Sequence, residues 1–418
     1  MDEKYLHRTI DPKISEYLQI FGALSIEGPK WCGKTSTMKH HTLSHSNLMD
    51  ASTRTLAEAD PKSVLLGANP HGIDEWQEIP AIWDIVRNDV DERHEKGLYI
   101  LTGSVKPWKK KEIKHSGVGR IARMHMRPMT LFESNDSTGK TKLRDLMDGI
   151  APVPHKSDME IHDLIEVACR GGFPESLALT GNARYVLPKE YLDTTIESEI
   201  PRTDSVIKDK RKFRLLLTAL SRGNASIIKN STLHNDVQSA AGEFSTATLS
   251  SYLNIMRDLY LLEEIPGWAP QIRSKTRLLS SPKRMLVDPS LVVAALGTTS
   301  EKLYKDFQAF GTIFEGLCLR DLLVYADAID AEVYHYRDNS NLEVDAIVEK
   351  RDGTWGAFEI KLGGRGIDQG AKSLLQLRDK MDRQGHSVPV TLTIITGSGI
   401  CMTRPDGVNV VPISTLTA

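Results

Sequence analysis

A glycine-rich stretch near the amino terminus limits the possible folds of this chain more than any other segment. Its residues, Gly28-Pro29-Lys30-Trp31-Cys32-Gly33-Lys34-Thr35, match the pattern G-x-x-x-x-G-K-[ST]. The run Ala23 to Glu27 before it predicts a buried strand, and the unbroken segment Lys34 to Leu43 after it predicts a helix. In such a unit, backbone N–H groups of the loop and of the first helical turn face phosphate oxygens. We therefore expect a parallel α/β sheet with a phosphate-binding loop.

Two residues of this loop have predicted roles of their own. Lys34 is expected to contact the β and γ phosphates of a nucleotide, and Thr35 to ligate Mg²⁺. The loop as a whole would bind the nucleotide; its residues are Gly28, Pro29, Lys30, Trp31, Cys32, Gly33, Lys34, Thr35 and Ser36. A glycine turn beside an exposed lysine is the alternative interpretation.

An acidic pair further along supplies the carboxylates that nucleotide hydrolysis requires. Asp74 and Glu75 lie in the segment Ile73-Asp74-Glu75-Trp76-Gln77. We expect Asp74 to bind Mg²⁺ and Glu75 to activate the attacking water. The preceding residues, Pro70-His71-Gly72, form a poor hydrophobic strand, so an ordinary loop or helix cap is the alternative.

Two later positions are candidates for sensing the γ phosphate. A short strand predicted at 98–102 ends in Thr102-Gly103-Ser104, whose hydroxyl groups could contact that phosphate; ordinary turn residues are the alternative. Arg120 follows the basic loop 106–115 and could stabilise phosphate charge in the site of a neighbouring subunit, or be only a solvated surface arginine. The lysines of this loop, with Trp108, could instead bind a nucleic-acid backbone, a solvated charge run being the alternative.

Composition narrows the class of protein. A length of 418 residues predicts about two to four domains. The 53 Lys and Arg residues nearly balance 55 Asp and Glu residues, which excludes a small nucleic-acid-coating protein and restricts any nucleic-acid contact to a local patch. No apolar run approaches the roughly 20 residues of a membrane span, so we expect no membrane contact. The first residues, Met1 to Asp11, lack the apolar core of a signal peptide, which favours a cytoplasmic location.

Changes in pattern along the chain indicate domain boundaries. We assign 12–135 to a P-loop core, 136–208 to a helical lid and connector, 209–280 to a winged-helix-like segment, and 281–418 to an α/β domain. In the winged-helix-like segment, the second helix is predicted at 245–258. Its only cation is Arg257, so packing against protein is an alternative to reading DNA.

The last segment contains a second candidate site for metal-dependent chemistry. Asp345 lies in a predicted strand, and the next strand contains Glu359 and Lys361 on one face. If these strands are antiparallel neighbours, Asp345 and Glu359 meet and can hold Mg²⁺, while Lys361 positions water or stabilises phosphorane charge. The structural alternative is a salt bridge from Asp345 to Lys361 or Arg337. The E-x-K pattern by itself has no specificity, since it also occurs at 112–114, without a preceding acidic strand.

These motifs together resemble bacterial and archaeal AAA+ ATPases with a carboxyl-terminal domain of unknown function that has a restriction-endonuclease-like, PD-(D/E)XK, core. The matching segments are 28–35, 73–77, 100–104, 117–120, 127–133 and 171–175. The pair His71-Gly72 departs from the family, which usually has apolar residues there.

The resemblance implies a function for each part of the chain. ATP and Mg²⁺ would be the cofactors, with a Walker A loop, a Walker B strand ending at Asp74 and Glu75, and a sensor at Thr102 or Ser104. Arg120 resembles the arginine finger of ring-shaped homo-oligomers, the hexamer being the candidate form. Glu315, on a predicted helix, takes the place of the nuclease helix carboxylate. We therefore expect an ATP-hydrolysing AAA+ protein that acts on DNA through a Mg²⁺-dependent nuclease-like domain, or an ATP-regulated scaffold that binds a partner without cleavage.

Overall fold

The computed structural model describes residues 5–105, 117–200, 209–271, 274, 277 and 280–418. These residues form two compact units. The first contains the described residues up to 128 together with 254–261, and the second contains 129–200, 209–253 and the described residues from 262 onward. The predicted basic loop 106–115 lies outside the described residues.

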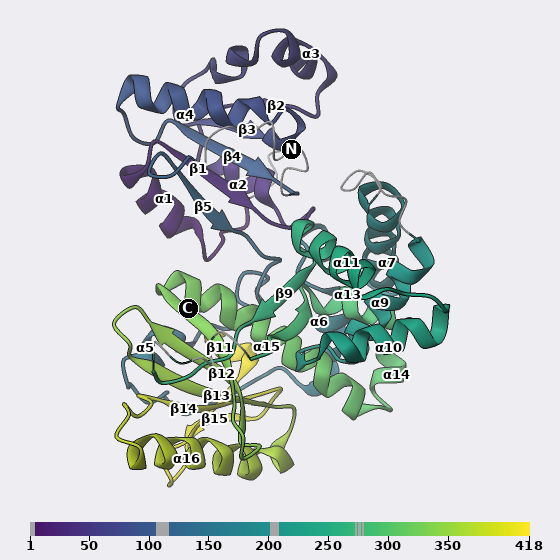
Figure 1. The fold of residues 1–418 in the computed structure, drawn as a ribbon. Coiled ribbons are helices and arrows are strands. Elements are labelled where there is room, and N and C mark those ends of the chain that lie inside the picture. Colours follow the sequence, from purple (N-terminus) through teal and green to yellow (C-terminus); the bar gives the residue numbers. More distant parts are fainter. Residues whose placement is uncertain (1–4, 106–116, 201–208, 272–273, 275–276, 278–279) are drawn as a thin grey trace. The chain divides into compact units, whose positions relative to one another are not determined.

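The first unit is built on a parallel sheet with the strand order β2-β3-β4-β1-β5 (Figure 1). The strands are β1 (Ala23–Glu27), β2 (Ser44–Asn47), β3 (His71–Asp74), β4 (Tyr99–Gly103) and β5 (Ile121–His125). The helices are α1 (Asp11–Ile20), α2 (Lys34–His40), α3 (Ala51–Ala59) and α4 (Ala81–Arg93). Because strands alternate with helices, each crossover returns the chain to the same end of the sheet and the strands run parallel. The predicted α/β class is thereby confirmed.

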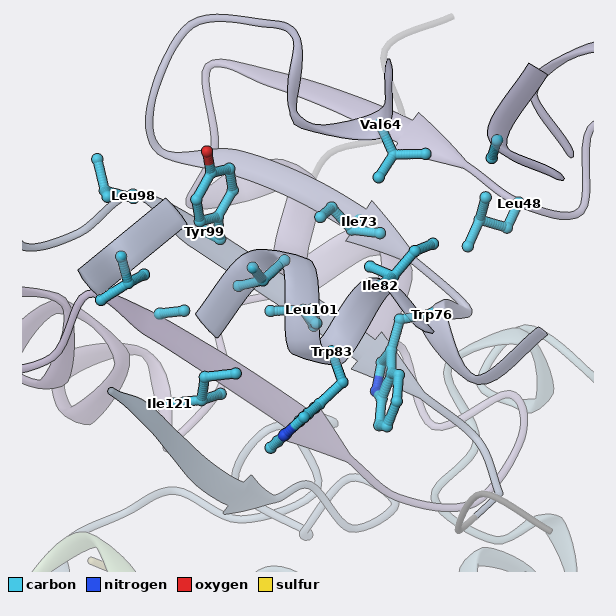
Figure 2. Packing of buried hydrophobic residues seen from close by; sticks show 14 residues of the cluster. Leu48, Val64, Ile73, Trp76, Ile82, Trp83, Leu98, Tyr99, Leu101 and Ile121 are labelled. Carbon is cyan, nitrogen blue, oxygen red and sulfur yellow. The ribbon is translucent and has the colours of Figure 1, made fainter. Parts of the chain in front are cut away.

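Helices cover both faces of this sheet, as the alternation of its side chains shows. On β1, Ala23 joins a buried cluster with the α4 residues Ile82 and Trp83, whereas Leu24 joins a second cluster with Ile14 of α1. Successive strand residues point to opposite faces, so two clusters require two covered faces. Figure 2 shows the first cluster, where the rings of Trp76 and Trp83 lie 4.8 Å apart. Such a sheet leaves its strand ends free for a ligand site.

The helical part of the second unit precedes and surrounds a small antiparallel sheet. Its helices are α6 (Ile161–Arg170), α7 (Ala183–Thr194), α9 (Lys210–Arg222), α10 (Asn230–Ala241), α13 (Pro289–Leu296) and α14 (Ser300–Leu303). Helix α11 (Thr246–Asp258) begins in this unit, and its last residues belong to the first unit. The strands, in the order β8-β10-β9, are β8 (Ser226–Ile227), β9 (Leu262–Ile265) and β10 (Lys283–Leu286). The helix predicted at 245–258 corresponds to α11.

The remainder of the second unit contains a mixed sheet in the order β11-β12-β13-β14-β16-β15-β7. Its strands are β7 (His155–Lys156), β11 (Ala331–Arg337), β12 (Glu343–Lys350), β13 (Trp355–Lys361), β14 (Leu392–Thr396), β15 (Ile400–Thr403) and β16 (Asn409–Pro412). Helix α15 (Phe307–Ala328) packs against β11 and β13, and α16 (Ile367–Arg383) against β13 and β14 (Figure 1). The strands predicted near 331–336, 342–349, 355–362 and 390–396 are therefore confirmed.

The segment at 141–156, predicted as part of a helical lid, instead joins the carboxyl-terminal strands. Strand β6 (Thr141–Lys142) pairs with β17 (Leu416–Thr417), and β7 pairs with β15; α5 (Leu143–Met147) lies between β6 and β7. Each of these short strands finds its partner far along the chain, so local pattern contained no signal for the pairing.

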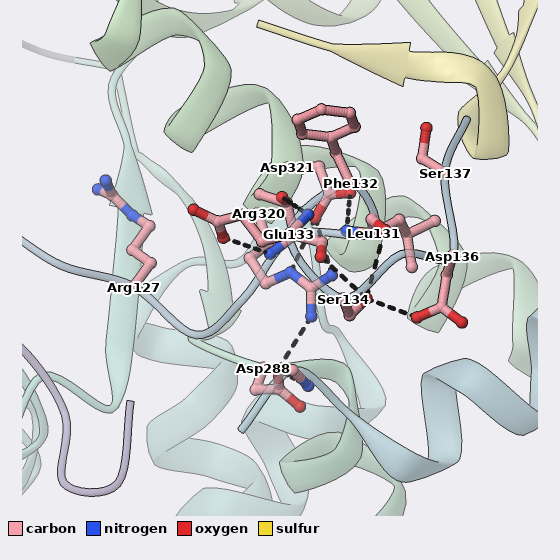
Figure 3. Close-up of polar contacts among 12 residues, drawn as sticks. Arg127, Leu131, Phe132, Glu133, Ser134, Asp136, Ser137, Asp288, Arg320 and Asp321 are labelled. Atoms are coloured by element: carbon pink, nitrogen blue, oxygen red, sulfur yellow. Dashed lines mark hydrogen bonds and ion pairs between the residues drawn. The ribbon is translucent and has the colours of Figure 1, made fainter. Parts of the chain in front are cut away.

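A buried ion network ties together motifs that the family resemblance had singled out. Figure 3 shows Arg320 between two carboxylates, with Asp288 at 3.0 Å and Asp321 at 2.8 Å. Asp321 also accepts a hydrogen bond from the backbone of Leu131, and Asp288 accepts one from the backbone of Gly172. Burial raises the pKa of Asp321 to about 6. The segments 127–133 and 171–175 thus supply backbone donors to a buried charge cluster, which gives them a structural role.

Candidate functional site

The glycine-rich loop between β1 and α2 has the shape that a phosphate-binding loop requires. A side chain at Gly28 would lie 2.1 Å from the carbonyl oxygen of Met126, and Gly33 has a φ of 102° that favours glycine. The guanidinium group of Arg8, a buried residue, donates to the carbonyl oxygen of Cys32 at 2.7 Å. Arg8 therefore fixes the loop, a role that the sequence analysis missed because nothing in the local pattern marks it.

The ammonium group of Lys34 is buried within this loop. It donates hydrogen bonds to the carbonyl oxygens of Gly28 and Pro29 at 3.0 and 2.7 Å. Both partners are neutral, so the positive charge of Lys34 is not cancelled by a carboxylate there. Phosphate oxygens can replace the two carbonyl groups as stronger, charged acceptors, which fits the predicted role of Lys34.

Asp74 meets Thr35 at the end of β3. The Thr35 hydroxyl lies 3.0 Å from both carboxylate oxygens of Asp74, and the Thr102 hydroxyl also donates to Asp74. Burial raises the pKa of Asp74, with the charge of Glu75 acting in the same direction. A hydroxyl and a carboxylate at this spacing are oxygen donors of the kind that Mg²⁺ prefers, so these residues fit the predicted ion.

The strand before Asp74 accommodates its unusual histidine through two serine contacts. His71 is buried in β3, where its Nδ1 lies 2.7 Å from the hydroxyl of Ser44 and its Nε2 lies 3.2 Å from that of Ser46. Burial lowers the pKa of His71, which favours the neutral ring. The segment Pro70-His71-Gly72 predicted a strand only weakly, yet the strand is present as β3. The serine hydroxyl groups of neighbouring β2 provide hydrogen-bond partners for the buried ring of His71.

The carboxylate of Glu75 is held by two side-chain donors. Ser104 donates to Glu75 Oε2 at 2.8 Å, and the amide of Gln77 donates to the same oxygen. Glu75 itself has a φ of 57°, a conformation that non-glycine residues seldom adopt. Ser104, predicted to sense the γ phosphate, therefore contacts Glu75. The contribution of Gln77 was missed, although its position two residues after Glu75 was available as a signal.

The remaining predicted residues of this site lie at its margins. Trp31 of the loop is 47% exposed, and Ser36 is exposed on α2. Arg120 lies just before β5 and pairs with Asp91 at 2.6 Å, with its side chain 45% exposed. Its predicted action in a neighbouring subunit stays a prediction.

The carboxyl-terminal candidate residues meet on adjacent strands. Strands β12 and β13 are antiparallel, and the pair Ala346–Phe358 brings Asp345 beside Glu359, as predicted. Asp345 Oδ2 accepts from the backbone N–H of Ile360 at 2.9 Å and lies 3.2 Å from Lys361 Nζ. Lys361 also contacts Glu359. Asp345, Glu359 and Lys361 all line an open cleft of about 680 Å³, which the sequence analysis did not predict.

A second lysine, which the sequence analysis missed, reaches this cluster from β10. Lys283 Nζ lies 2.6 Å from the carboxylate of Glu315 and 3.5 Å from that of Asp345. Lys283 directly follows Pro282 at the start of a strand, so the local sequence gave no indication of its partners. The structural alternative of an Asp345–Lys361 ion pair is present, whereas Arg337 pairs with Glu343 at 4.0 Å.

Burial and neighbouring charges shift the pKa values of the three carboxylates in this cluster in different directions. Burial, reinforced by the charge of Asp345, raises the pKa of Glu359 to about 8, and burial raises that of Glu315 to about 7. Burial also opposes ionisation of Asp345, but the charges of Lys283 and Lys361 outweigh it and lower its pKa. Among the described residues, no group of three or more His, Cys, Asp or Glu side chains is arranged to hold a metal ion. The two carboxylates Asp345 and Glu359 still fit Mg²⁺, which commonly binds one or two carboxylates and keeps several waters.

Three protein-family models match successive parts of the chain. Residues 21–135 match an AAA domain family, residues 161–302 match a domain of unknown function, DUF8612, and residues 310–416 match another, DUF4143. Two uncharacterized proteins, from Mycobacterium bovis and Mycobacterium tuberculosis, are each 24% identical over 345 residues, covering 80% of this chain and 69% of theirs.

A solved structure, the Walker-type ATPase of Pyrococcus abyssi, is similar to 70% of this chain and 97% of its own, with 12% identity and a TM-score of 0.42. The family match at 21–135 coincides with the parallel sheet and its glycine-rich loop, and we refer to this part of the chain by that similarity as the AAA-type P-loop domain. None of the described helices is long and apolar enough to cross a membrane.

Proposed function

We propose that the AAA-type P-loop domain binds and hydrolyses ATP, and that this cycle drives the second unit to act on DNA through a Mg²⁺-dependent nuclease-like site. The ATP part is supported by the AAA family match at 21–135 and by the meeting of Lys34, Thr35, Asp74 and Glu75 at one edge of the parallel sheet. The DNA part is supported chiefly by the meeting of Asp345, Glu359 and Lys361 in an open cleft.

Each residue of the nucleotide site has a distinct task in ATP hydrolysis. Lys34 exchanges its two carbonyl partners for oxygens of the β and γ phosphates. Thr35 and Asp74 would hold Mg²⁺, which neutralises charge on the phosphate oxygens. Glu75 accepts a proton from the attacking water, and Ser104 and Gln77 keep its carboxylate turned toward that position.

In the second unit, Asp345 and Glu359 would hold Mg²⁺, which supplies Lewis-acid activation of a phosphodiester and its attacking water. Lys361 donates to the same pair of carboxylates, so its ammonium group is positioned to stabilise negative charge that develops on phosphorus-bound oxygens. Helix α16 contributes further polar residues to the cleft, namely Gln369, Ser373, Gln376, Lys380 and Arg383. These neutral and cationic donors suit a nucleic-acid backbone.

Two parts of this proposal concern assembly and DNA positioning. The helices α9, α10 and α11 with the small sheet β8-β10-β9 have the order of elements expected of a winged helix, which would bring DNA to the cleft. Arg120 would act across subunits of a homo-oligomeric ring, where it would leave Asp91 for the phosphate of a neighbour.

An ATP-regulated scaffold is the second candidate function. It is favoured by the ion pairs of Lys361 and Lys283, which already satisfy the carboxylates that a metal would use. In that case the cleft would bind a partner without cleavage.

A plasmid-nicking assay separates the two functions. The wild type, Asp345→Ala and, as a matched control, Asp352→Ala in the exposed turn after β12 are incubated with supercoiled DNA and Mg²⁺ or Mn²⁺, with and without ATP. We expect nicking by the wild type and Asp352→Ala and none by Asp345→Ala. Absence of any metal-dependent, Asp345-dependent product would leave the scaffold.

A further inference from the structure

Lys283 places a permanent positive charge inside the carboxylate cluster. Its side chain is only 1% exposed, and its ammonium group is within 3.5 Å of three oxygens: one from the carboxylate of Glu315, and the carboxylate and backbone carbonyl of Asp345. A buried ammonium group is tolerated only where acceptors surround it, and here the acceptors are the residues that a metal ion would use.

Lys283 and Glu315 lie behind the part of the cluster that faces the cleft. Asp345, Glu359 and Lys361 line the cleft, whereas Lys283 and Glu315 are not among its lining residues. An ion that enters from the cleft therefore meets Asp345 and Glu359 first, whereas the carboxylate of Glu315 is already paired with the ammonium group of Lys283.

The backbone of β10 fixes Lys283 in this place. The next residue, Arg284, points to the opposite face of the strand, where it pairs with Glu264 at 2.8 Å and contacts Asn230 at 2.7 Å. Strand β10 also pairs with β9 on one side and β8 on the other. The backbone at Lys283 is therefore held on both sides, which places the base of its side chain on the face opposite Arg284.

We infer that Lys283 occupies one of the cation positions of this cluster, so that the site takes a single divalent ion between Asp345 and Glu359, while Glu315 serves as the anchor of Lys283. This inference rests on the proposed function of the same site. With all three carboxylates ionised, the form in which carboxylates bind metal ions, they exceed the two lysines by one negative charge. One divalent ion converts this surplus into a net positive charge, which suits a phosphodiester anion.

Counting bound Mn²⁺ tests the inference without any measurement of cleavage. The nucleotide-free full chain is dialysed against Mn²⁺, and bound metal is counted for the wild type, Asp345→Ala, Lys283→Met and Lys283→Gln. Lys350→Met, on β12, is the control. We expect removal of Lys283 to add about one Mn²⁺ per chain, since it opens the second cation position, and Glu315→Gln in the Lys283→Met background to abolish that gain.

The decisive quantity is the difference between variants. An unchanged count in folded Lys283→Met and Lys283→Gln would overturn the inference, as would Asp345-dependent binding of two ions by the wild type. If neither Lys283 variant folds, Mn²⁺ binding by Glu315→Gln tests the inference instead. The same number of bound Mn²⁺ ions as in the wild type supports Glu315 as the anchor of Lys283, whereas loss of the bound ion rejects that role. A gain of Mn²⁺ without nicking would reject DNA cleavage alone, whereas nicking without the gain would reject the inference alone.

Discussion

The two candidate sites use the same residue types in opposite ways. In the nucleotide site, Lys34 is held by two carbonyl groups and Asp74 by two hydroxyl groups, so each charge has neutral partners. In the carboxyl-terminal site, Lys283 and Lys361 pair directly with the carboxylates. The first arrangement keeps opposite charges apart and available for a charged ligand. The second cancels much of its charge internally, so its folding and its ligand binding are coupled.

The largest effect is expected for the contribution of Lys34 to ATP turnover. We expect Lys34→Ala to lower ATP turnover by about 1,000-fold, because the β and γ phosphates lose their charged donor. The free energy of unfolding should change little, since the partners of Lys34 are carbonyl groups. Steady-state phosphate release and urea unfolding measure the two quantities. Lys39→Ala, exposed on the same helix, is the control; turnover by Lys34→Ala at the rate of this control would contradict the assignment.

In contrast to Lys34, Lys361 should contribute strongly to the free energy of unfolding. Lys361→Met leaves Glu359 without a cation and Asp345 with Lys283 alone, and breaking a buried pair in this way lowers the free energy of unfolding by about 3 kcal/mol. Urea unfolding compares this variant with Lys350→Met. Equal stability of the two variants would show that charge cancellation does not hold this cluster together.

The pH dependence of stability should reveal the buried acid Glu359. Its folded-state pKa of about 8 lies above its ordinary value of 4.5, so the stability that the protonated form contributes is present below about pH 4.5 and is lost as the pH rises through 8. Glutamine imitates the protonated acid and does not titrate. The free energy of unfolding of Glu359→Gln, taken relative to that of the wild type, should therefore be on the order of 2 kcal/mol larger at about pH 8.5 than at pH 5. Parallel stability curves for the two proteins would contradict the shift.

The smallest effect is expected at Asp74. Its pKa is raised by burial, so Asp74→Asn removes a buried charge and should stabilise the fold by about 1 kcal/mol or less, although Mg²⁺-dependent ATP turnover is lost. Thermal unfolding at neutral pH measures the gain. A loss of stability would show that Asp74 is held more firmly by Thr35 and Thr102 than burial disfavours it.

The sequence predicted those parts of the molecule in which local pattern determines structure. The glycine-rich loop, β4 and the pairing of Asp345 with Glu359 followed from motifs and strand periodicity. The partners of Lys283 and Arg8 could not be predicted, because each side chain reaches acceptors that lie far away in the sequence. The short strands β6 and β7 were missed for the same reason. Tertiary contacts therefore determined which residues complete each site.

ATP binding and turnover by Glu75→Gln test the assignment of the nucleotide site most directly. Glu75 is held by Ser104 and Gln77 for one task, the activation of water. We predict that Glu75→Gln binds ATP as the wild type does, while its turnover falls by about 100-fold or more. Glu78→Gln, on the same segment, should turn over ATP normally. Hydrolysis by Glu75→Gln at the wild-type rate would contradict the assignment.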